Sequence, residues 1–160
     1  MALTLRNQLV ETALQWQERY GVAPSITTAL SEYDAAVTLL GMSEAAFEQS
    51  QLTATAVQRG YDFVCDGVRY QIKANRPSGR PGSKVTLCAK ARNYDWDRLI
   101  WILYNREYCI QEAWEWDVSD YAAAFDPIVR ISPAHMRMGN AVAPVVLVPA
   151  LSSLRPETSI

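Results

Sequence analysis

The segment from residue 60 to residue 73 reads GYDFVCDGVRYQIK. Two runs rich in β-branched and aromatic side chains, residues 61–65 and 68–73, flank the pair Asp66 and Gly67. An Asp-Gly pair in this position favours a two-residue type I′ turn, because that turn needs a positive φ at both central residues. The segment therefore predicts a β-hairpin that begins a sheet.

The predicted hairpin brings three polar side chains to one face. Residues at equal distance from a two-residue turn face each other, so Asp62 opposes Gln71. Side chains alternate between the two faces of a strand, so Lys73 projects on the same side as Gln71 and Asp62. A carboxylate, an amide oxygen and an ammonium group can together hold a hard divalent cation and orient a water molecule. Such a set is suited to phosphodiester hydrolysis.

The same face has a simpler interpretation, because Asp, Gln, Arg and Lys are ordinary on the solvated side of an antiparallel hairpin. The charge pattern favours a ligand instead. Residues 67–94 contain seven of the fifteen Lys and Arg residues and no Asp or Glu, although the whole chain has a formal net charge of -2. A local positive field of this kind suits a polyphosphate backbone.

The basic stretch supplies the candidates for nucleic-acid contact. Residues 75–84 form a predicted loop of small and basic residues, whose main-chain N–H groups can approach phosphates. A solvated connection between strands is the other interpretation of this loop. The candidate contacts are Arg69, Arg76, Arg80, Lys84, Lys90 and Arg92.

Composition limits the class of protein. The chain has 160 residues, of which 49% are hydrophobic and 20% charged, and this profile indicates a compact domain with an apolar core. No apolar run approaches the ~20 residues that a bilayer span requires, and the first residues lack the apolar stretch of a signal peptide. We expect a cytoplasmic protein that does not bind a membrane.

Cysteine and histidine usage disfavours a disulfide framework, a Cys/His zinc site and a Ser-His-Asp triad, since there are three cysteines and one histidine. Cys65, Cys88 and Cys109 are predicted to be small buried residues in strands, and His135 a surface residue.

Four aromatic residues divide into two groups. Trp101 and Tyr104 lie in an apolar run and are predicted to belong to the core. Tyr94 and Trp96 stand among charged neighbours, and we expect them to contact a ligand.

Other elements follow from hydrophobic periodicity and capping residues. The predicted helices cover residues 5–20, a segment capped by Ser31 that ends at Gly41, residues 43–58 and residues 119–125, with Ser119 as the last cap. The predicted strands cover residues 85–88, 99–104 and 108–113, and a proline-broken tail follows.

The order of Asp62, the hairpin and Gln71-Ile72-Lys73 resembles the core of the PD-(D/E)XK nuclease superfamily. The match is to the variant in which Gln replaces the second acidic residue, as in Mrr-like restriction enzymes. The resemblance covers about residues 31–113. It implies an α/β fold with a restriction endonuclease-like core, a mixed central sheet flanked by helices, and a helical N-terminal section.

The resemblance also implies roles for individual residues. Asp62 would ligate Mg²⁺, with Mn²⁺ as a substitute, Gln71 would add a side-chain oxygen, and the main chain of Ile72 would add its carbonyl oxygen. Lys73 would orient or activate the attacking water. Two features depart from the family pattern: no proline precedes Asp62, and Gln71 lowers the negative charge of the site by one unit, which weakens its affinity for a cation.

Such families often add a carboxylate from the upstream helix, and Glu32 matches that placement. Glu32 is thus a further candidate for catalysis and for metal binding. The alternative is that Glu32 only stabilises a helix N-terminus, where the helix dipole favours a carboxylate.

We expect a single domain over residues 1–160. Its parts are a helical section, residues 1–60, a nuclease-like sheet core, residues 61–116, and a helix with an irregular C-terminal arm, residues 117–160. The predicted function is metal-dependent endonucleolytic cleavage of DNA. A non-catalytic nucleic-acid-binding module on the same scaffold and a protein-interaction domain are the alternatives.

Duplex cleavage needs two sites acting on two strands, so we expect a homodimer. The apolar residues 142–148 have two interpretations, as part of that contact or as a cover for the sheet of their own subunit.

Overall fold

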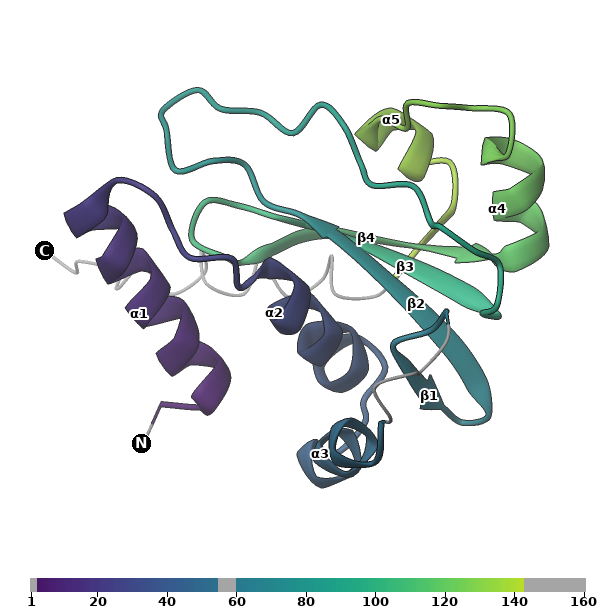
Figure 1. Ribbon diagram of the computed structural model, residues 1–160, viewed down its shortest axis with the longest axis horizontal. Coiled ribbons are helices and arrows are strands. Elements are labelled where there is room, and N and C mark those ends of the chain that lie inside the picture. Colours follow the sequence, from purple (N-terminus) through teal and green to yellow (C-terminus); the bar gives the residue numbers. More distant parts are fainter. Residues whose placement is uncertain (1–2, 55–59, 143–160) are drawn as a thin grey trace, which may run out of the picture.

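The computed structural model describes residues 3–54 and 60–142 (Figure 1). The helices are α1 (Leu5–Tyr20), α2 (Thr27–Tyr33), the π-helix η1 (Asp34–Leu39), α3 (Glu44–Thr53), α4 (Val118–Phe125) and α5 (Pro133–Met136). The strands are β1 (Phe63–Cys65), β2 (Val68–Asn75), β3 (Arg98–Tyr104), β4 (Ile110–Asp117) and β5 (Asn140–Ala141).

The strands form one mixed sheet in the order β1-β2-β3-β4-β5. β2 and β3 run parallel, and the other neighbouring pairs are antiparallel. The connection from β2 to β3, residues 76–97, contains no helix. The fold is therefore α/β, with N-terminal helices, a five-stranded mixed sheet and a following helix. The predicted helical N-terminal section and mixed central sheet are confirmed.

The hairpin that begins the sheet has the predicted register. Phe63 pairs with Tyr70, and Cys65 pairs with Val68 across the turn. Asp66 has a φ of 50° and Gly67 a φ of 77°, which are the positive values that a type I′ turn requires. A local sequence signal thus sets the register of the first strand pair.

Helices cover both faces of the sheet. Ile100 and Ile102 of β3 pack with Leu30 of α2 on one face, and Leu99 and Trp101 pack in a second cluster on the other. Each of these four β3 side chains is fully buried, which explains a continuous apolar run where a half-exposed strand would alternate. Figure 1 shows α1 and α2 on one side of the sheet, and α4 and α5 on the other.

The second helix differs from its prediction. It begins at Thr27 rather than at Ser31, and it continues directly into the π-helix η1. Ser31 is a buried residue in the middle of α2, where its hydroxyl donates to the carbonyl oxygen of Thr28. Serine can satisfy its hydroxyl this way inside a helix, so it is not a reliable start signal by itself.

Several boundaries in the second half also differ from prediction. Residues 85–88 are not a strand, because only Cys88 forms an isolated bridge, with Ile131. The strand predicted to begin at Tyr108 begins at Ile110, since Tyr108 has a φ of 60° in the preceding turn. Asp117, not Ser119, is the N-cap of α4.

Two other predictions reach outside the described residues. The predicted helix over residues 43–58 ends at Thr53 as α3, and residues 55–59 lie outside the description. Most of the apolar run 142–148 lies outside it as well. Among the described residues, no helix has the length and apolar character needed to cross a membrane.

Candidate functional site

Asp62 lies just before β1, at the point where the edge of β2 loses its partner strand. β1 pairs with β2 only as far as Tyr70, whose carbonyl oxygen accepts from the main-chain N–H of Asp62 at 2.7 Å. Beyond it, the Asp62 Oδ2 atom accepts from the main-chain N–H of Ile72 at 2.7 Å. The carboxylate therefore takes the place of a strand carbonyl, which orients it firmly at the sheet edge.

Gln71 and Lys73 meet Asp62 at this edge. The Gln71 Nε2 atom donates to Asp62 Oδ2 at 3.2 Å, as the predicted opposition of the two residues requires. The amide nitrogen faces the carboxylate, whereas the predicted role needs the amide oxygen, and a half-turn of the amide exchanges the two. Burial raises the pKa of the Asp62 carboxyl group, and the positive charge of Lys73 opposes that rise.

Helix α2 brings Glu32 to the same place. The carboxyl group of Glu32 hydrogen-bonds the carboxylate of Asp62. Burial and the negative charge of Asp62 raise the pKa of Glu32 to about 7. Glu32 is the sixth residue of the seven-residue α2, far from the helix N-terminus, so the helix dipole does not account for its position.

Asp62 is also less acidic than an ordinary aspartate. Burial raises the pKa of its carboxyl group, and the Ile72 N–H, Lys73 and Glu32 oppose this effect. Below about pH 7 the Glu32–Asp62 pair therefore shares a proton, because two buried carboxylates in contact repel each other. A cation between them would relieve the same repulsion.

An open polar cleft of about 280 Å³ contains three of the four candidates for catalysis. It is lined by Gly60, Tyr61, Asp62, Gln71, Lys73, Arg92 and Asn93. Three of these, Gly60, Tyr61 and Asn93, were not predicted as site residues. The signal for Gly60 is its position directly before the predicted hairpin, where a glycine allows a positive φ or a close approach of another segment.

Gly60 lets the Asn93 loop approach the site closely. Its φ is +81°, and a Cβ atom there would lie 2.6 Å from Asn93 Oδ1 and 2.7 Å from Asp95 Cβ. Both the backbone angle and the close approach require glycine. This contact fixes the part of the cleft wall that Gly60 and Asn93 form.

The basic residues predicted to bind nucleic acid occupy different kinds of position. Arg92 is exposed and lines the cleft. The side chains of Arg80 and Lys84 are exposed and have no hydrogen-bond partner among the residues that the structure describes. Arg69 is exposed too, but it forms an ion pair with Asp97 at 3.0 Å.

The other two basic candidates bind main-chain carbonyl groups of the protein itself. Arg76 donates to the carbonyl oxygen of Arg106, and Lys90 donates to that of Asp126 at 2.9 Å. These contacts anchor the long β2–β3 connection to the rest of the fold.

The aromatic predictions are confirmed for the core and wrong in one case at the surface. Trp101 and Tyr104 are buried as predicted. Trp96 is only 1% exposed and packs against Tyr121, so it is not available to a ligand. Tyr94 is 38% exposed, and its hydroxyl donates to Asp126.

The cysteines and the histidine deviate in part from prediction. Cys88 is buried and Cys65 is half-buried, but Cys109 is exposed because it follows the turn before β4. His135 is half-buried in α5, where its Nδ1 atom accepts from the main-chain N–H of Ser132 in a capping box.

Oxygen ligands for a cation are available at the Asp62 edge. They are the carboxylates of Glu32 and Asp62, the amide of Gln71 and the carbonyl of Ile72. Within residues 3–54 and 60–142, no group of three or more His, Cys, Asp or Glu residues is arranged to hold a metal. A cation here would have two acidic ligands, which is the usual number for Mg²⁺, because Mg²⁺ keeps several waters and binds substrate phosphates.

The sequence was compared with family models and with curated proteins. No protein-family model matches the chain, and no curated protein matches it at a significant level of similarity. Function is therefore inferred from the residues and the geometry of the cleft.

Proposed function

We propose that this protein is a metal-dependent DNA endonuclease with a restriction endonuclease-like core, in the Gln variant of the PD-(D/E)XK pattern. The observation that carries the proposal is the contact between the carboxyl groups of Glu32 and Asp62, beside Gln71 and Lys73. A helix and a hairpin far apart in sequence supply the two acidic groups. A purely solvated hairpin face would not place a second, half-buried carboxyl group against Asp62.

The donor set fits Mg²⁺, with Mn²⁺ as a substitute. Two carboxyl groups in contact need either a shared proton or a cation, and the pKa of Glu32 at about 7 makes the proton easy to displace near neutral pH. When bound at these oxygens, Mg²⁺ would polarise the scissile phosphate and make a nearby water more acidic.

The residues of the chain have separate tasks in the proposed hydrolysis. The Ile72 N–H and Gln71 hold the Asp62 carboxylate in one orientation. Lys73 orients the attacking water and stabilises the negative charge that develops on the phosphate. Water adds to phosphorus, the bond from phosphorus to one sugar oxygen breaks, and the departing oxygen takes a proton, so the products are a phosphate monoester and a hydroxyl group.

The surroundings of the cleft suit a polyanion. Arg92 is the basic residue on its wall, and the exposed Arg80 and Lys84 extend positive charge along the connection after β2. Cleavage of both strands of a duplex would need two copies of the site, so the proposal includes a homodimer.

The direct test is cleavage of supercoiled plasmid DNA by the full chain with Mg²⁺, with Mn²⁺ and with EDTA. We expect nicked and linear products with either metal and none with EDTA. Asp62→Asn and Lys73→Met should each reduce the rate about 100-fold or more, because they remove a ligand and the charge-stabilising group. Asp66→Asn is the matched control: it removes the same charge in the exposed turn, where asparagine also accepts a positive φ.

Two outcomes would contradict the proposal. If the parent protein does not cleave but binds DNA, and both variants bind equally well, the chain is a non-catalytic nucleic-acid-binding module. If the parent protein has no measurable affinity for DNA at low salt, a protein-interaction role is favoured instead.

A further inference from the structure

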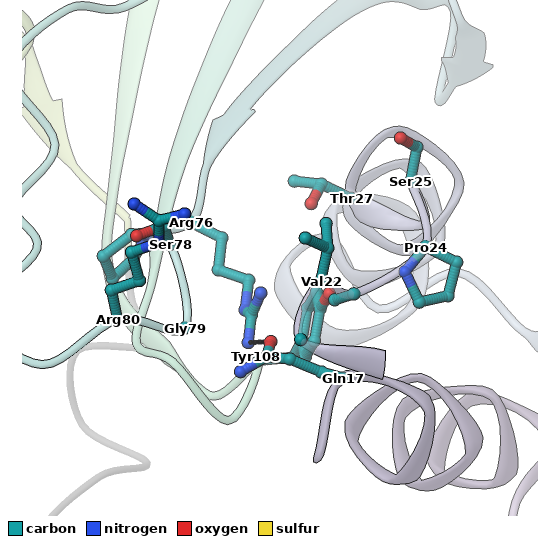
Figure 2. Close-up of a pocket in the computed structure, with 13 residues that line it drawn as sticks. Gln17, Val22, Pro24, Ser25, Thr27, Arg76, Ser78, Gly79, Arg80 and Tyr108 are labelled. Atoms are coloured by element: carbon teal, nitrogen blue, oxygen red, sulfur yellow. Dashed lines mark hydrogen bonds between the residues drawn. The ribbon is translucent and has the colours of Figure 1, made fainter. Parts of the chain in front are cut away.

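A second cavity, of about 220 Å³, lies at the far end of β2 (Figure 2). One wall consists of Gln17 near the end of α1, residues 21–25 of the α1–α2 connection and Thr27 at the start of α2. The other wall consists of residues 76–80, which follow β2, together with Tyr108. None of these residues lines the cleft at Asp62.

The lining of this cavity suits an anion with several oxygens. Its lining residues include Arg76 and Arg80, the hydroxyl-bearing Ser25, Thr27, Ser78 and Tyr108, and no Asp or Glu. Guanidinium groups and hydroxyls are the side-chain donors that most often bind phosphate oxygens. The absence of a carboxylate from the lining leaves the positive charge uncompensated inside the cavity.

Arg76 is held in a fixed position within this cavity. Its guanidinium carbon lies 4.1 Å from the centre of the buried Tyr108 ring. Its Nη2 atom donates to Gln17 Oε1 at 2.8 Å, the bond drawn in Figure 2, and its Nε atom donates to the carbonyl oxygen of Arg106 at 2.9 Å. Nη1 forms no hydrogen bond with any described residue. One donor edge of a preorganised arginine is therefore free for a ligand.

The main chain next to Arg80 is also held in place, through contacts of Gly79. Arg106 Nη2 donates to the carbonyl oxygen of Gly79 at 2.7 Å. Gly79 packs so closely on α1 that a Cβ atom there would lie 1.7 Å from Gln17 Nε2. The side chain of Arg80 is exposed, so a second cation stands at the rim of the cavity on an anchored backbone.

Two elements connect the cavity to the cleft. Arg76 follows Lys73 by three residues, which is about 10 Å at the rise of a strand. Helix α2 lies along β2 and reaches from Thr27 in the cavity to Glu32 beside Asp62. One strand of duplex DNA advances about 3.4 Å along the axis per phosphate and also rotates about that axis, so the separation corresponds to at most about three nucleotides.

We propose that this cavity is a phosphate subsite that takes a backbone phosphate of the strand being cleaved, within about three nucleotides of the bond at Asp62. The location along the strand rests on the proposed nuclease function, whereas the capacity to bind phosphate rests on Arg76 and Arg80 alone. A free inorganic phosphate or nucleotide has the same chemistry, and the test below separates the two sources.

The test measures binding of a fluorescent duplex oligonucleotide to the full chain in EDTA, where no cleavage occurs. Arg80→Gln should weaken binding about tenfold at low salt, as expected for one charge-assisted contact, and make the salt dependence shallower by about 0.9 in log–log slope. Arg76→Lys keeps the positive charge but loses the planar, two-pronged donor geometry of the guanidinium group, and it should weaken DNA binding several-fold. Arg130→Gln, an exposed arginine that lines neither cavity, is the control and should bind like the parent.

The position of the subsite is tested by shortening the oligonucleotide from each end. The affinity of the parent should fall in one step when one particular phosphate, within about three nucleotides of the cleavage point, is removed. The Arg80→Gln variant should lack that step. Thermal unfolding of each variant tests whether the Arg76 substitution leaves the protein folded.

The possible results distinguish failure of the phosphate subsite from failure of the nuclease proposal. If Arg80→Gln binds DNA like the parent while the parent cleaves, the subsite is wrong and the nuclease proposal stands. If Arg80→Gln weakens DNA binding but the parent does not cleave, phosphate binding at this cavity stands, and the nuclease proposal and the position along a cleaved strand fail. If inorganic phosphate binds the parent as tightly as the oligonucleotide does, the occupant is a free anion and the backbone assignment is overturned.

Discussion

The carboxyl group of Glu32 in helix α2 hydrogen-bonds the carboxylate of Asp62 at the start of the hairpin. The two residues are separated by thirty positions in the chain, and the contact forms because α2 packs along β2. Burial of both groups raises both pKa values, and the Glu32 pKa reaches about 7. When both carboxyl groups are ionised, their negative charges repel each other, and a bound cation would relieve this repulsion.

This pair predicts how stability depends on pH. The pKa of Glu32 is 4.5 in an unperturbed chain and about 7 when folded, so in that window the folded state holds a proton that the unfolded state does not. The free energy of unfolding of the parent should therefore fall as pH rises from about 4.5 to about 7. With allowance for solvent screening the loss is about 1 to 2 kcal/mol.

Glu32→Gln should flatten this profile, because glutamine does not titrate, and should be more stable than the parent at pH 8. Urea denaturation in metal-free buffer at pH 5, 6, 7 and 8 measures the difference. Glu18→Gln, on the exposed side of α1, is the control and should keep the profile of the parent. Parallel profiles for Glu32→Gln and the parent would show that the two carboxyl groups are not coupled.

A buried ion pair between α1 and η1 should matter for stability much more than a surface pair. Asp34 is 1% exposed and accepts from Arg6 Nε at 3.0 Å, from Arg6 Nη2 at 2.8 Å and from the Tyr104 hydroxyl at 2.6 Å. Arg6→Met leaves a buried carboxylate without its cation and should cost about 3 to 5 kcal/mol. Arg69→Met, which breaks the exposed pair with Asp97, should change the denaturation midpoint very little. Equal effects of the two substitutions would contradict this ranking.

Gly60 should be needed for activity as well as for folding. Gly60→Ala introduces a Cβ at a positive φ and pushes it against Asn93 and Asp95, which displaces a wall of the cleft. Gly41→Ala has the same backbone strain, with a φ of +74°, but open space around the new atom. Gly41→Ala should lose about 1 kcal/mol of stability from backbone strain, and Gly60→Ala should lose more, because the new atom also clashes with Asn93 and Asp95.

Only Gly60→Ala should also slow plasmid cleavage, by about tenfold or more, because small displacements of a reacting group have large effects on rate. Rates are compared at equal concentrations of folded protein. An unchanged rate in Gly60→Ala would mean that the Asn93 wall plays no part in the reaction.

Arg92 and Arg69 should differ in their contribution to DNA binding. Arg92 lines the cleft, whereas the charge of Arg69 is already compensated by Asp97. Arg92→Gln should weaken binding about tenfold at low salt and make the salt dependence shallower by about 0.9 in log–log slope. Arg69→Gln should have a smaller effect on both. Fluorescence anisotropy over a range of salt concentrations measures the two slopes, and a larger effect at Arg69 would place the DNA on the other side of the hairpin.

Local signals in the sequence were sufficient for the hairpin and for the first helix. Asp66 and Gly67 specify a turn by their own backbone preferences, and the turn sets the register that brings Asp62 to Gln71. The predicted strand over residues 85–88 was wrong because local signals alone do not make a strand. A short β-prone run becomes a strand only when another strand is available to pair with it, and Cys88 meets only Ile131.

The amino-acid sequence by itself determined the features that depend on contacts between residues near one another in the chain. These features are the hairpin, helix α1 and the polar face of β2. The tertiary structure alone decided which distant groups join that face. It brought Glu32 to Asp62, turned Arg76 inward onto Tyr108 and buried Trp96. The physical reason is that turn and helix preferences depend on a few neighbouring residues, whereas the approach of α2 and of the long connection to β2 depends on packing between surfaces that the chain forms only when it is folded.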